Sequence, residues 1–234
     1  MFSDDGPLPS RLALQVDGSV GLALWDLHGR AEEARRPDSL LRDAKALGIR
    51  EALGIDLHAL FGTPGLAEVH HAAAVDREVD AFLTRHPDGT VVSLGEGLET
   101  RRFRVHRQPA RWIVVDRPEL IRLREAFIAP DARHLHVPAD VPSRSWMPLV
   151  PRDRPALITA RGALWPSPEP EVADVLASLA RFAPGATVVF DTVPPWFARR
   201  ARRGWGPTDR FVVPEVGWAT TDPAADLERW VPGA

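Results

Sequence analysis

The sequence predicts an α/β fold in which a mostly parallel sheet carries helices on both faces. After residue 89, short apolar segments rich in β-branched residues alternate with helical segments, which is typical of parallel strands joined by helices. The 234 residues suffice for one substantial core, and hydrophobic residues make up 44% of them. No Gly/Ser-rich linker divides the chain, so we expect a single domain over residues 1–234.

Residues 1–65 are expected to form a helical cover and residues 66–234 the α/β core. In the cover, apolar residues recur at helical spacing over residues 38–47, and Gly48 is expected to end that helix. A turn then leads into a longer helix over residues 66–85, the first element of the core.

The first predicted strand of the core covers residues 90–94, a short apolar run bounded by turn residues. Helices are expected over residues 118–127 and 169–182, and Pro170 suits the first turn of the second one. Further strands are expected over residues 112–116, 134–137, 156–160, 187–191 and 211–213.

Composition excludes several classes of function. The formal net charge of −3 argues against a nucleic-acid partner bound by bulk positive charge. No apolar run approaches the ~20 residues that span a bilayer, and residues 1–10 lack the order of a signal peptide. We therefore expect no membrane partner and a cytoplasmic location. The absence of cysteine excludes disulfides, thiolate metal sites and a cysteine nucleophile.

Other polar and aromatic groups have a structural and a functional interpretation. His134 and His136 face one side of a predicted strand and could ligate a metal, but no third ligand accompanies them, so we expect no metal site. The basic run over residues 199–203 is expected to be a solvated surface, with an anchor for an anionic substrate as the alternative. Packing is favoured over an aromatic platform for Trp196, Trp205 and Trp218.

A glycine turn follows the first predicted strand directly, as Gly95-Glu96-Gly97-Leu98-Glu99-Thr100. Glycines allow a tight turn and the close backbone approach of a nucleotide. The next predicted strand ends at Asp116, about 20 residues further on, where a carboxylate can accept hydrogen bonds from ribose hydroxyls. This order predicts a nucleotide-binding site.

The charge of the turn selects among nucleotide ligands. A dinucleotide fold places a pyrophosphate at the helix that follows the turn, and it usually has a third glycine or alanine where Thr100 stands. Glu96 and Glu99 would repel that pyrophosphate. S-adenosylmethionine carries a sulfonium and an ammonium and no phosphate, so the acids favour it over NAD.

The segment over residues 91–101, together with Val115-Asp116-Arg117-Pro118-Glu119, resembles the leucine carboxyl methyltransferase family, in particular its bacterial polyketide O-methyltransferase branch. That branch has a similar leucine-glycine-x-glycine-leucine-aspartate-threonine-arginine motif and an aspartate-x-proline-glutamate strand end. The resemblance implies a Rossmann-like class I methyltransferase fold with S-adenosylmethionine as cofactor. It also implies methyl transfer to a carboxylate or hydroxyl of a small molecule, in polyketide or other secondary metabolism.

The resemblance also implies roles for individual residues. The glycine turn would line the methionine part of the cofactor, Asp116 would hold the ribose, and Asp140 with Val141 would lie at the adenine. Glu99 stands where the family usually has aspartate. The residues expected at the cofactor are His71, Gly95, Glu96, Gly97, Glu99, Thr100, Asp116, Asp140, Val141 and Arg161.

Two positions depart from the family pattern. Arg161 stands where the family has a glutamate, and a guanidinium that faces a sulfonium weakens binding unless it pairs with an acid such as Glu96 or Glu99. His71 stands where the family often has an arginine for the cofactor carboxylate, and a histidine cannot form a bidentate clamp.

These departures leave three interpretations open. The chain is a working methyltransferase with rearranged contacts, or a relative that has lost methyl transfer and serves as a binding or partner protein, or an enzyme for another reaction on the same scaffold. A carboxylate acceptor needs no general base, whereas a hydroxyl acceptor would use His70, His71 or His106.

Overall fold

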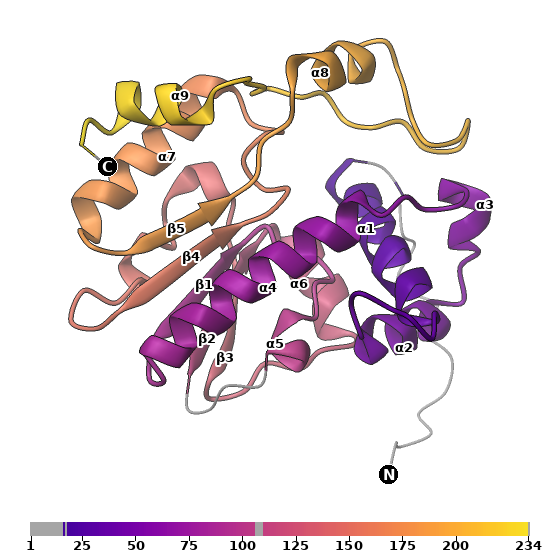
Figure 1. The fold of residues 1–234 in the computed structure, drawn as a ribbon, viewed down its shortest axis with the longest axis horizontal. Helices are drawn as coiled ribbons and strands as arrows, with labels where there is room; N and C mark the ends of the chain where they lie inside the picture. The colour runs from indigo at the N-terminus through magenta and orange to yellow at the C-terminus, as the bar shows by residue number, and fades with distance from the viewer. Residues whose placement is uncertain (1–15, 17, 106–109, 234) are drawn as a thin grey trace.

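The computed structural model describes residues 16, 18–105 and 110–233, and in them five strands form one parallel sheet (Figure 1). The strand order is β3-β2-β1-β4-β5. The chain adds β2 and β3 on one side of β1 and then crosses over to add β4 and β5 on the other, so the order switches between β1 and β4. Ligands of open α/β sheets bind outside the carboxyl ends of the strands at such a point. The strands are β1 (Thr90–Leu94), β2 (Arg111–Asp116), β3 (His134–Pro138), β4 (Ala156–Ala160) and β5 (Thr187–Phe190).

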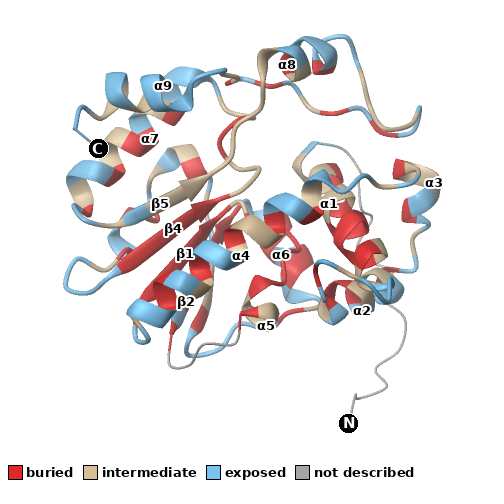
Figure 2. Ribbon diagram, viewed as in Figure 1, coloured by how far each residue is buried: buried red, intermediate tan, exposed pale blue. Residues whose placement is uncertain are grey.

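Helices pack on both faces of this sheet, as the sequence predicts. Alternate residues of a strand face opposite sides. Val91 of β1 packs with Val79 of α4 (Ala67–Arg85), whereas the next residue, Val92, belongs to the cluster that contains Val175 of α7 (Glu169–Phe182). The strands β1 and β4 are buried along their whole length, which is why their sequences are continuously apolar (Figure 2).

The N-terminal cover consists of α1 (Gly18–Ala34), α2 (Ala44–Leu53) and α3 (Leu57–Phe61). The helix predicted over residues 38–47 is wrong at both ends. The Asp43 carboxylate accepts a hydrogen bond from the Ala46 amide and caps α2, so the helix begins one residue later. Its end is at Gly54, in the left-handed conformation with φ 63°, and Gly48 lies inside the helix.

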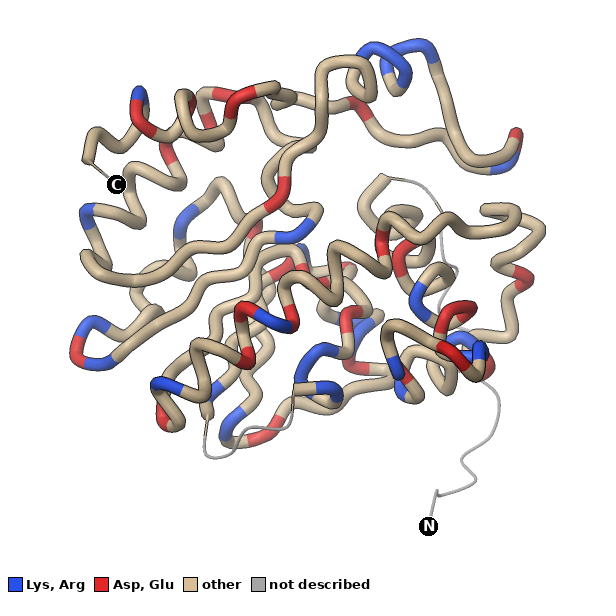
Figure 3. Tube along the Cα trace, in the orientation of Figure 1, with Lys and Arg blue, Asp and Glu red and all other residues tan. Residues whose placement is uncertain are grey.

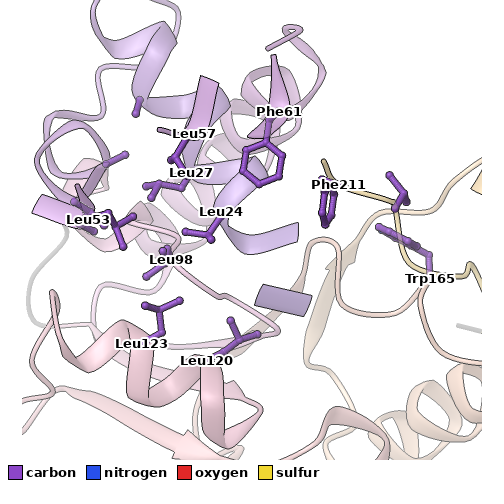
Figure 4. Packing of buried hydrophobic residues seen from close by; sticks show 14 of the residues in the cluster. Leu24, Leu27, Leu53, Leu57, Phe61, Leu98, Leu120, Leu123, Trp165 and Phe211 are labelled. Carbon is purple, nitrogen blue, oxygen red and sulfur yellow. The ribbon is translucent and has the colours of Figure 1, made fainter. Parts of the chain in front are cut away.

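The cover is fastened to the core through an apolar cluster. Leu24 and Leu27 of α1 lie in this cluster with Leu98 of the glycine turn, and with Leu120 and Leu123 of α6 (Pro118–Glu125) (Figure 4). All five side chains are buried. This packing places α1 beside the carboxyl ends of the strands, where it forms part of the site.

The C-terminal part returns over the sheet and ends with α8 (Pro195–Ala201) and α9 (Pro223–Trp230). The strand predicted over residues 211–213 is wrong: Phe211 makes one isolated bridge with Thr208, and its ring packs against Trp25 and Phe61 of the cover. The apolar residues of this segment are therefore loop packing. The remaining elements are α5 (Arg101–Arg104), η1 (Val141–Ser143) and η2 (Met147–Leu149). No helix in the described part of the chain is long and apolar enough to cross a membrane.

Candidate cofactor site at the carboxyl ends of the strands

A cavity of about 1070 Å³ opens at the carboxyl ends of the strands, between the sheet, α1 and the C-terminal segment. Ligand pockets typically measure ~300–1,000 Å³, so this one has room for a nucleotide-sized cofactor and an acceptor together. Nine of the ten residues predicted at the cofactor line it, namely His71, Gly95, Glu96, Gly97, Glu99, Asp116, Asp140, Val141 and Arg161.

The glycine turn has the close-approach geometry that the sequence predicts. Gly95 and Gly97 both have positive φ, 61° and 50°. A Cβ on Gly95 would lie 2.6 Å from the Cβ of Ala163, and one on Gly97 would lie 2.8 Å from the Cβ of Ala23. Both glycines are therefore required by backbone conformation and by space, and the turn presents bare backbone to the cavity.

Asp116, at the end of β2, lies directly against the turn in the cavity wall. One carboxylate oxygen accepts a hydrogen bond from the Gly97 amide at 2.7 Å, and the other accepts from the Arg117 amide at 2.8 Å. Burial raises the pKa of this carboxyl to about 6, against the two amide hydrogen bonds, which lower it. A carboxylate has about four acceptor sites, so two remain for the hydroxyls of a ribose.

Thr100 is the exception among the ten residues, because it does not line the cavity. Its hydroxyl donates to the Asp43 carboxylate at 2.5 Å and accepts from Arg30 at 2.9 Å, both on the side of the cover. Thr100 precedes α5, and the turn of the chain there directs its side chain away from the ligand. The prediction of a cofactor contact by its side chain is therefore wrong.

Glu99 reaches the cavity, but its charge is already matched inside the protein. Burial alone would raise its pKa, yet Arg104, Arg30, Arg101 and Arg161 hold the pKa of this carboxyl well below its usual range. Its oxygens lie 2.8 Å from Arg104 and 2.7 Å from Arg161. Glu99 is thus already paired and does not attract a sulfonium in the way that the sequence predicts; other acids that line the cavity include Glu96, Asp116 and Asp191.

The structure shows how Arg161 is accommodated at the end of β4. Its two terminal nitrogens lie 2.6 and 2.8 Å from the two carboxylate oxygens of Asp26 on α1, and one of them also lies 2.7 Å from Glu99. The pairing with Glu99 is one of the two that the sequence suggested. Asp26 was missed, because it lies 135 residues away in the chain and no local pattern marks it.

Arg161 belongs to a wider set of buried charges, here called the ion-pair cluster. Its arginines contact its acids at the base of α1, α4 and α5, and the signs balance, four against four. Opposite charges are thus paired in a region removed from water, and Arg101 also lies 3.8 Å from a fifth acid, Glu96. Its members are Asp26, Arg30, Asp43, Asp76, Glu99, Arg101, Arg104 and Arg161.

The histidines predicted as possible bases differ in position. His71 lines the cavity, and its Nδ1 lies 4.0 Å from a carboxylate oxygen of Asp191, just after β5. Asp191 also accepts from the Gly162 amide, and burial raises its pKa. His70 is exposed and does not line the cavity. His106 lies outside the described residues.

His134 and His136 lie on β3 away from the cavity. The two rings meet edge to face, and His136 is within hydrogen-bond distance of Arg124 and Glu125. Desolvation and Arg124 lower the pKa of His134 to about 3, so this ring stays neutral. Both side chains are thus bound into packing and local hydrogen bonds.

The wall of the cavity opposite the glycine turn is aromatic. Trp196 and Trp205 both line the cavity, the first with 56% of its surface exposed, so packing alone does not describe them. Trp218 is buried and packs on Phe190 and Trp230, as predicted. The basic run ends α8, where its arginines are exposed (Figure 3). Phe197 completes the aromatic wall, whereas Trp25 of α1 and Trp165 line the cavity nearer the glycine turn.

The parallel sheet and the cavity at its strand ends define the chain as an α/β protein with room for a nucleotide-sized ligand. No protein-family model matches it. It is 32% identical over 223 residues to the tetracenomycin polyketide synthesis O-methyltransferase TcmP of Streptomyces glaucescens. The matched residues make up 94% of this chain and 82% of that relative. The chain belongs to the family of this polyketide O-methyltransferase.

Solved structures of methyltransferases are similar at lower identity. Human N-acetylserotonin methyltransferase in complex with SAM matches with 13% identity and a TM-score of 0.46, over 90% of this chain and 61% of that one. PigF with SAH matches with 14% identity and a TM-score of 0.47, over 89% and 64%. This chain thus spans less than two thirds of the length of either protein.

Proposed function

We propose that this chain transfers the methyl group of S-adenosylmethionine to an oxygen of a polyketide-derived small molecule, in the cavity at the strand ends. The observation that carries the proposal is the glycine turn held against the Asp116 carboxylate in the wall of that cavity. The relation to the leucine carboxyl methyltransferase family is part of the same proposal and rests on the motif over residues 94–101.

The residues of this site fit the cofactor. Gly95 and Gly97 line the cavity with backbone alone, Asp116 has acceptor sites for the ribose, and Glu96 has a buried carboxylate oxygen without a partner. Asp140 and Val141 line the cavity beyond β3, where the adenine would lie. When bound, the cofactor supplies an electrophilic methyl group, and the protein has to orient an acceptor oxygen in line with it.

The pairing of Arg161 favours a working enzyme over a relative that has lost the cofactor. A bare guanidinium at the end of β4 would oppose a sulfonium, but two carboxylates hold this one within 2.8 Å. The charge reversal relative to the family is therefore compensated inside the protein, and the cavity wall keeps the acids Glu96, Asp116 and Asp191.

The acceptor is expected to be a largely apolar, flat molecule, because the wall opposite the turn is aromatic. A carboxylate acceptor is already nucleophilic, so positioning supplies most of the rate. A hydroxyl acceptor needs a base, and His71 beside Asp191 is the candidate that reaches the cavity.

Calorimetric titration with S-adenosylmethionine and S-adenosylhomocysteine tests the proposal. We expect saturable binding by the natural chain and a loss of at least about tenfold in Asp116→Ala, since a hydrogen bond to a charged group contributes ~1.5–3 kcal/mol. Asp88→Ala, at an exposed turn away from the cavity, is the matched control. No heat and no thermal stabilisation of the natural chain at millimolar ligand would overturn the proposal.

Two histidine variants separate the acceptor classes. His71→Gln and His70→Gln change neighbouring exposed residues of α4, but only the first lines the cavity. With a hydroxyl acceptor we expect kcat to fall about 10²-fold or more in His71→Gln alone, as for loss of a general base. Equal rates in the two variants with a hydroxyl acceptor would rule out His71 as the base.

A further inference from the structure

Arg124 is a buried arginine of α6 that contacts the glycine turn but does not line the cavity. Its Nη1 donates to the carbonyl of Gly97 at 3.0 Å and to the carbonyl of Glu99 at 2.8 Å. Among the described residues, its hydrogen bonds go to these two carbonyls and to two imidazoles, and to no carboxylate. A buried guanidinium that no carboxylate contacts costs stability, so its presence here points to a role at the turn.

Two histidines of β3 hold the other edge of this guanidinium. Arg124 Nε donates to Nε2 of His136 at 3.2 Å, and Nη2 lies 3.5 Å from Nε2 of His134. Burial and the charge of Arg124 lower the pKa of both imidazoles, so at pH 7 both rings are neutral and accept through Nε2. The proton then lies on Nδ1, which faces Glu125 at 3.3 Å in His136 and has no partner in His134. His134 thus leaves one hydrogen bond unmade at the place where it accepts from Arg124.

Gly97 is held from both sides by charged side chains. Its amide donates to Asp116 at 2.7 Å, and its carbonyl accepts from Arg124. The next carbonyl, that of Leu98, accepts from Arg30 at 3.0 Å, so three successive carbonyls of the turn are bound by buried guanidinium groups. Because a glycine has the widest choice of backbone conformation, these bonds select one conformation of the turn, with φ 50° at Gly97.

We infer that Arg124 is a positioning residue for cofactor binding, which holds the turn so that the Gly97 amide meets the Asp116 carboxylate. The inference rests on the proposed function, in which Asp116 binds the ribose. Arg124 acts through the backbone of the turn, since it does not line the cavity. His134 and His136 support its guanidinium from β3, which gives this histidine pair a role in the cofactor site.

Calorimetric titration with S-adenosylhomocysteine tests this role. Arg124→Gln removes the guanidinium, and Arg122→Gln makes the same change at an exposed position of the same helix, away from the cavity. We expect the affinity to fall about tenfold or more in the first variant, because the turn loses two hydrogen bonds from a charged group. The second variant should bind as the natural chain does.

The pH dependence of binding separates positioning from a general loss of packing. Burial raises the pKa of the Asp116 carboxyl, and among the charged groups that face it Arg124 lowers the pKa and Glu96 raises it. Without Arg124 the pKa of Asp116 rises further, so the midpoint of S-adenosylhomocysteine binding should move to higher pH in Arg124→Gln. A packing defect away from Asp116 would weaken binding without moving this midpoint.

His136→Phe tests the same role without removing the charge. It keeps an aromatic ring and removes the acceptor for Arg124 Nε, so we expect S-adenosylhomocysteine to bind about two- to fivefold more weakly. His86→Phe, at the end of α4 and away from the cavity, is the matched control and should bind as the natural chain does.

The outcomes distinguish this inference from the proposed function. Thermal unfolding first establishes which variants are folded, and if Arg124→Gln is not, His136→Phe decides. Unchanged affinity in the folded variants, or weaker binding by Arg124→Gln with the pH midpoint of the natural chain, would overturn the inference while cofactor binding stands. If the natural chain does not bind S-adenosylhomocysteine, the proposed function falls, and this inference falls with it.

Discussion

The two sides of the cavity are built from opposite chemistry. Beneath the glycine turn lies the ion-pair cluster, in which Arg30 and Asp43 are fully buried. Across the cavity lies the aromatic wall, where Trp196 is more than half exposed. In Figure 2 the strands β1 and β4 are red, whereas the segment around α8 is mostly tan and pale blue.

The contrast separates fixed from adaptable parts of the site. Buried, paired charges hold one geometry, because any displacement leaves a charge unpaired away from water. Exposed aromatic side chains contact a ligand through area rather than through directed bonds, so they tolerate changes in its shape. The first side is therefore the more rigid part of the site, and the second is the more adaptable.

Breaking the ion-pair cluster should have the largest effect. In Arg30→Gln, Asp43 and Asp26 lose a buried partner, and we expect the free energy of unfolding to fall by about 3–5 kcal/mol. Urea unfolding measures this. Arg36→Gln is the control, because its pair with Asp38 is exposed and should contribute less than ~1 kcal/mol. A fall in Arg30→Gln no larger than in the control would show that the cluster does not fasten the cover.

Filling the glycine turn should have the next largest effect. Gly95→Ala places a methyl group against Ala163 at a positive φ, and we expect a loss of about 2–3 kcal/mol in stability together with weaker S-adenosylhomocysteine binding. Gly54→Ala matches it in φ, at 63° against 61°, but nothing lies within 4 Å of the added Cβ and the residue does not line the cavity. The control should show backbone strain alone. Unchanged binding in Gly95→Ala would place the cofactor elsewhere.

The carboxyl of Asp116 should make cofactor binding depend on pH. With a pKa of about 6 this carboxyl is mostly ionised at pH 7 and mostly protonated at pH 5. The dissociation constant of the cofactor should therefore rise about tenfold as the pH falls from 7 to 5. The effect on stability has the opposite sign. Because folding raises this pKa from 3.8, the contribution of the group to stability is present below pH 4 and is lost as pH rises to about 6.

Asp116→Asn tests this cause, since it removes the titrating group and keeps Asp191 as a second buried carboxyl of raised pKa. Calorimetry from pH 5 to 8 should give a flatter profile in this variant. The same slope in the variant and the natural chain would assign the dependence to another group.

Truncating the aromatic wall should have the smallest effect. Trp196→Ala should raise KM for an apolar acceptor by about 2- to 10-fold and leave S-adenosylhomocysteine binding unchanged, because the ring is half-exposed. Leu149→Ala, another exposed apolar residue that does not line the cavity, should leave both unchanged. A change in cofactor affinity in Trp196→Ala would contradict the division of the cavity into two sides.

Local sequence patterns predicted the elements in which buried residues are continuous or recur at a regular spacing. The strands β1 and β4 and the helix α7 have the predicted bounds, because continuous apolar runs and helical spacing follow directly from burial. The segment over residues 211–213 has the same composition as a strand but meets no neighbouring strand, and Phe211 packs on the cover instead. Composition alone does not distinguish these two uses of apolar residues.

The sequence by itself determined the glycine turn and the acid at the end of the next strand, because these lie within about 25 residues and follow from backbone geometry. Only the tertiary structure decided what happens to Arg161. Its partner Asp26 is 135 residues distant, and the two meet because apolar packing brings α1 onto the turn. In a buried site the effect of a charge on stability and on ligand binding depends on which opposite charge the fold places beside it. No local spacing in the sequence specifies that partner.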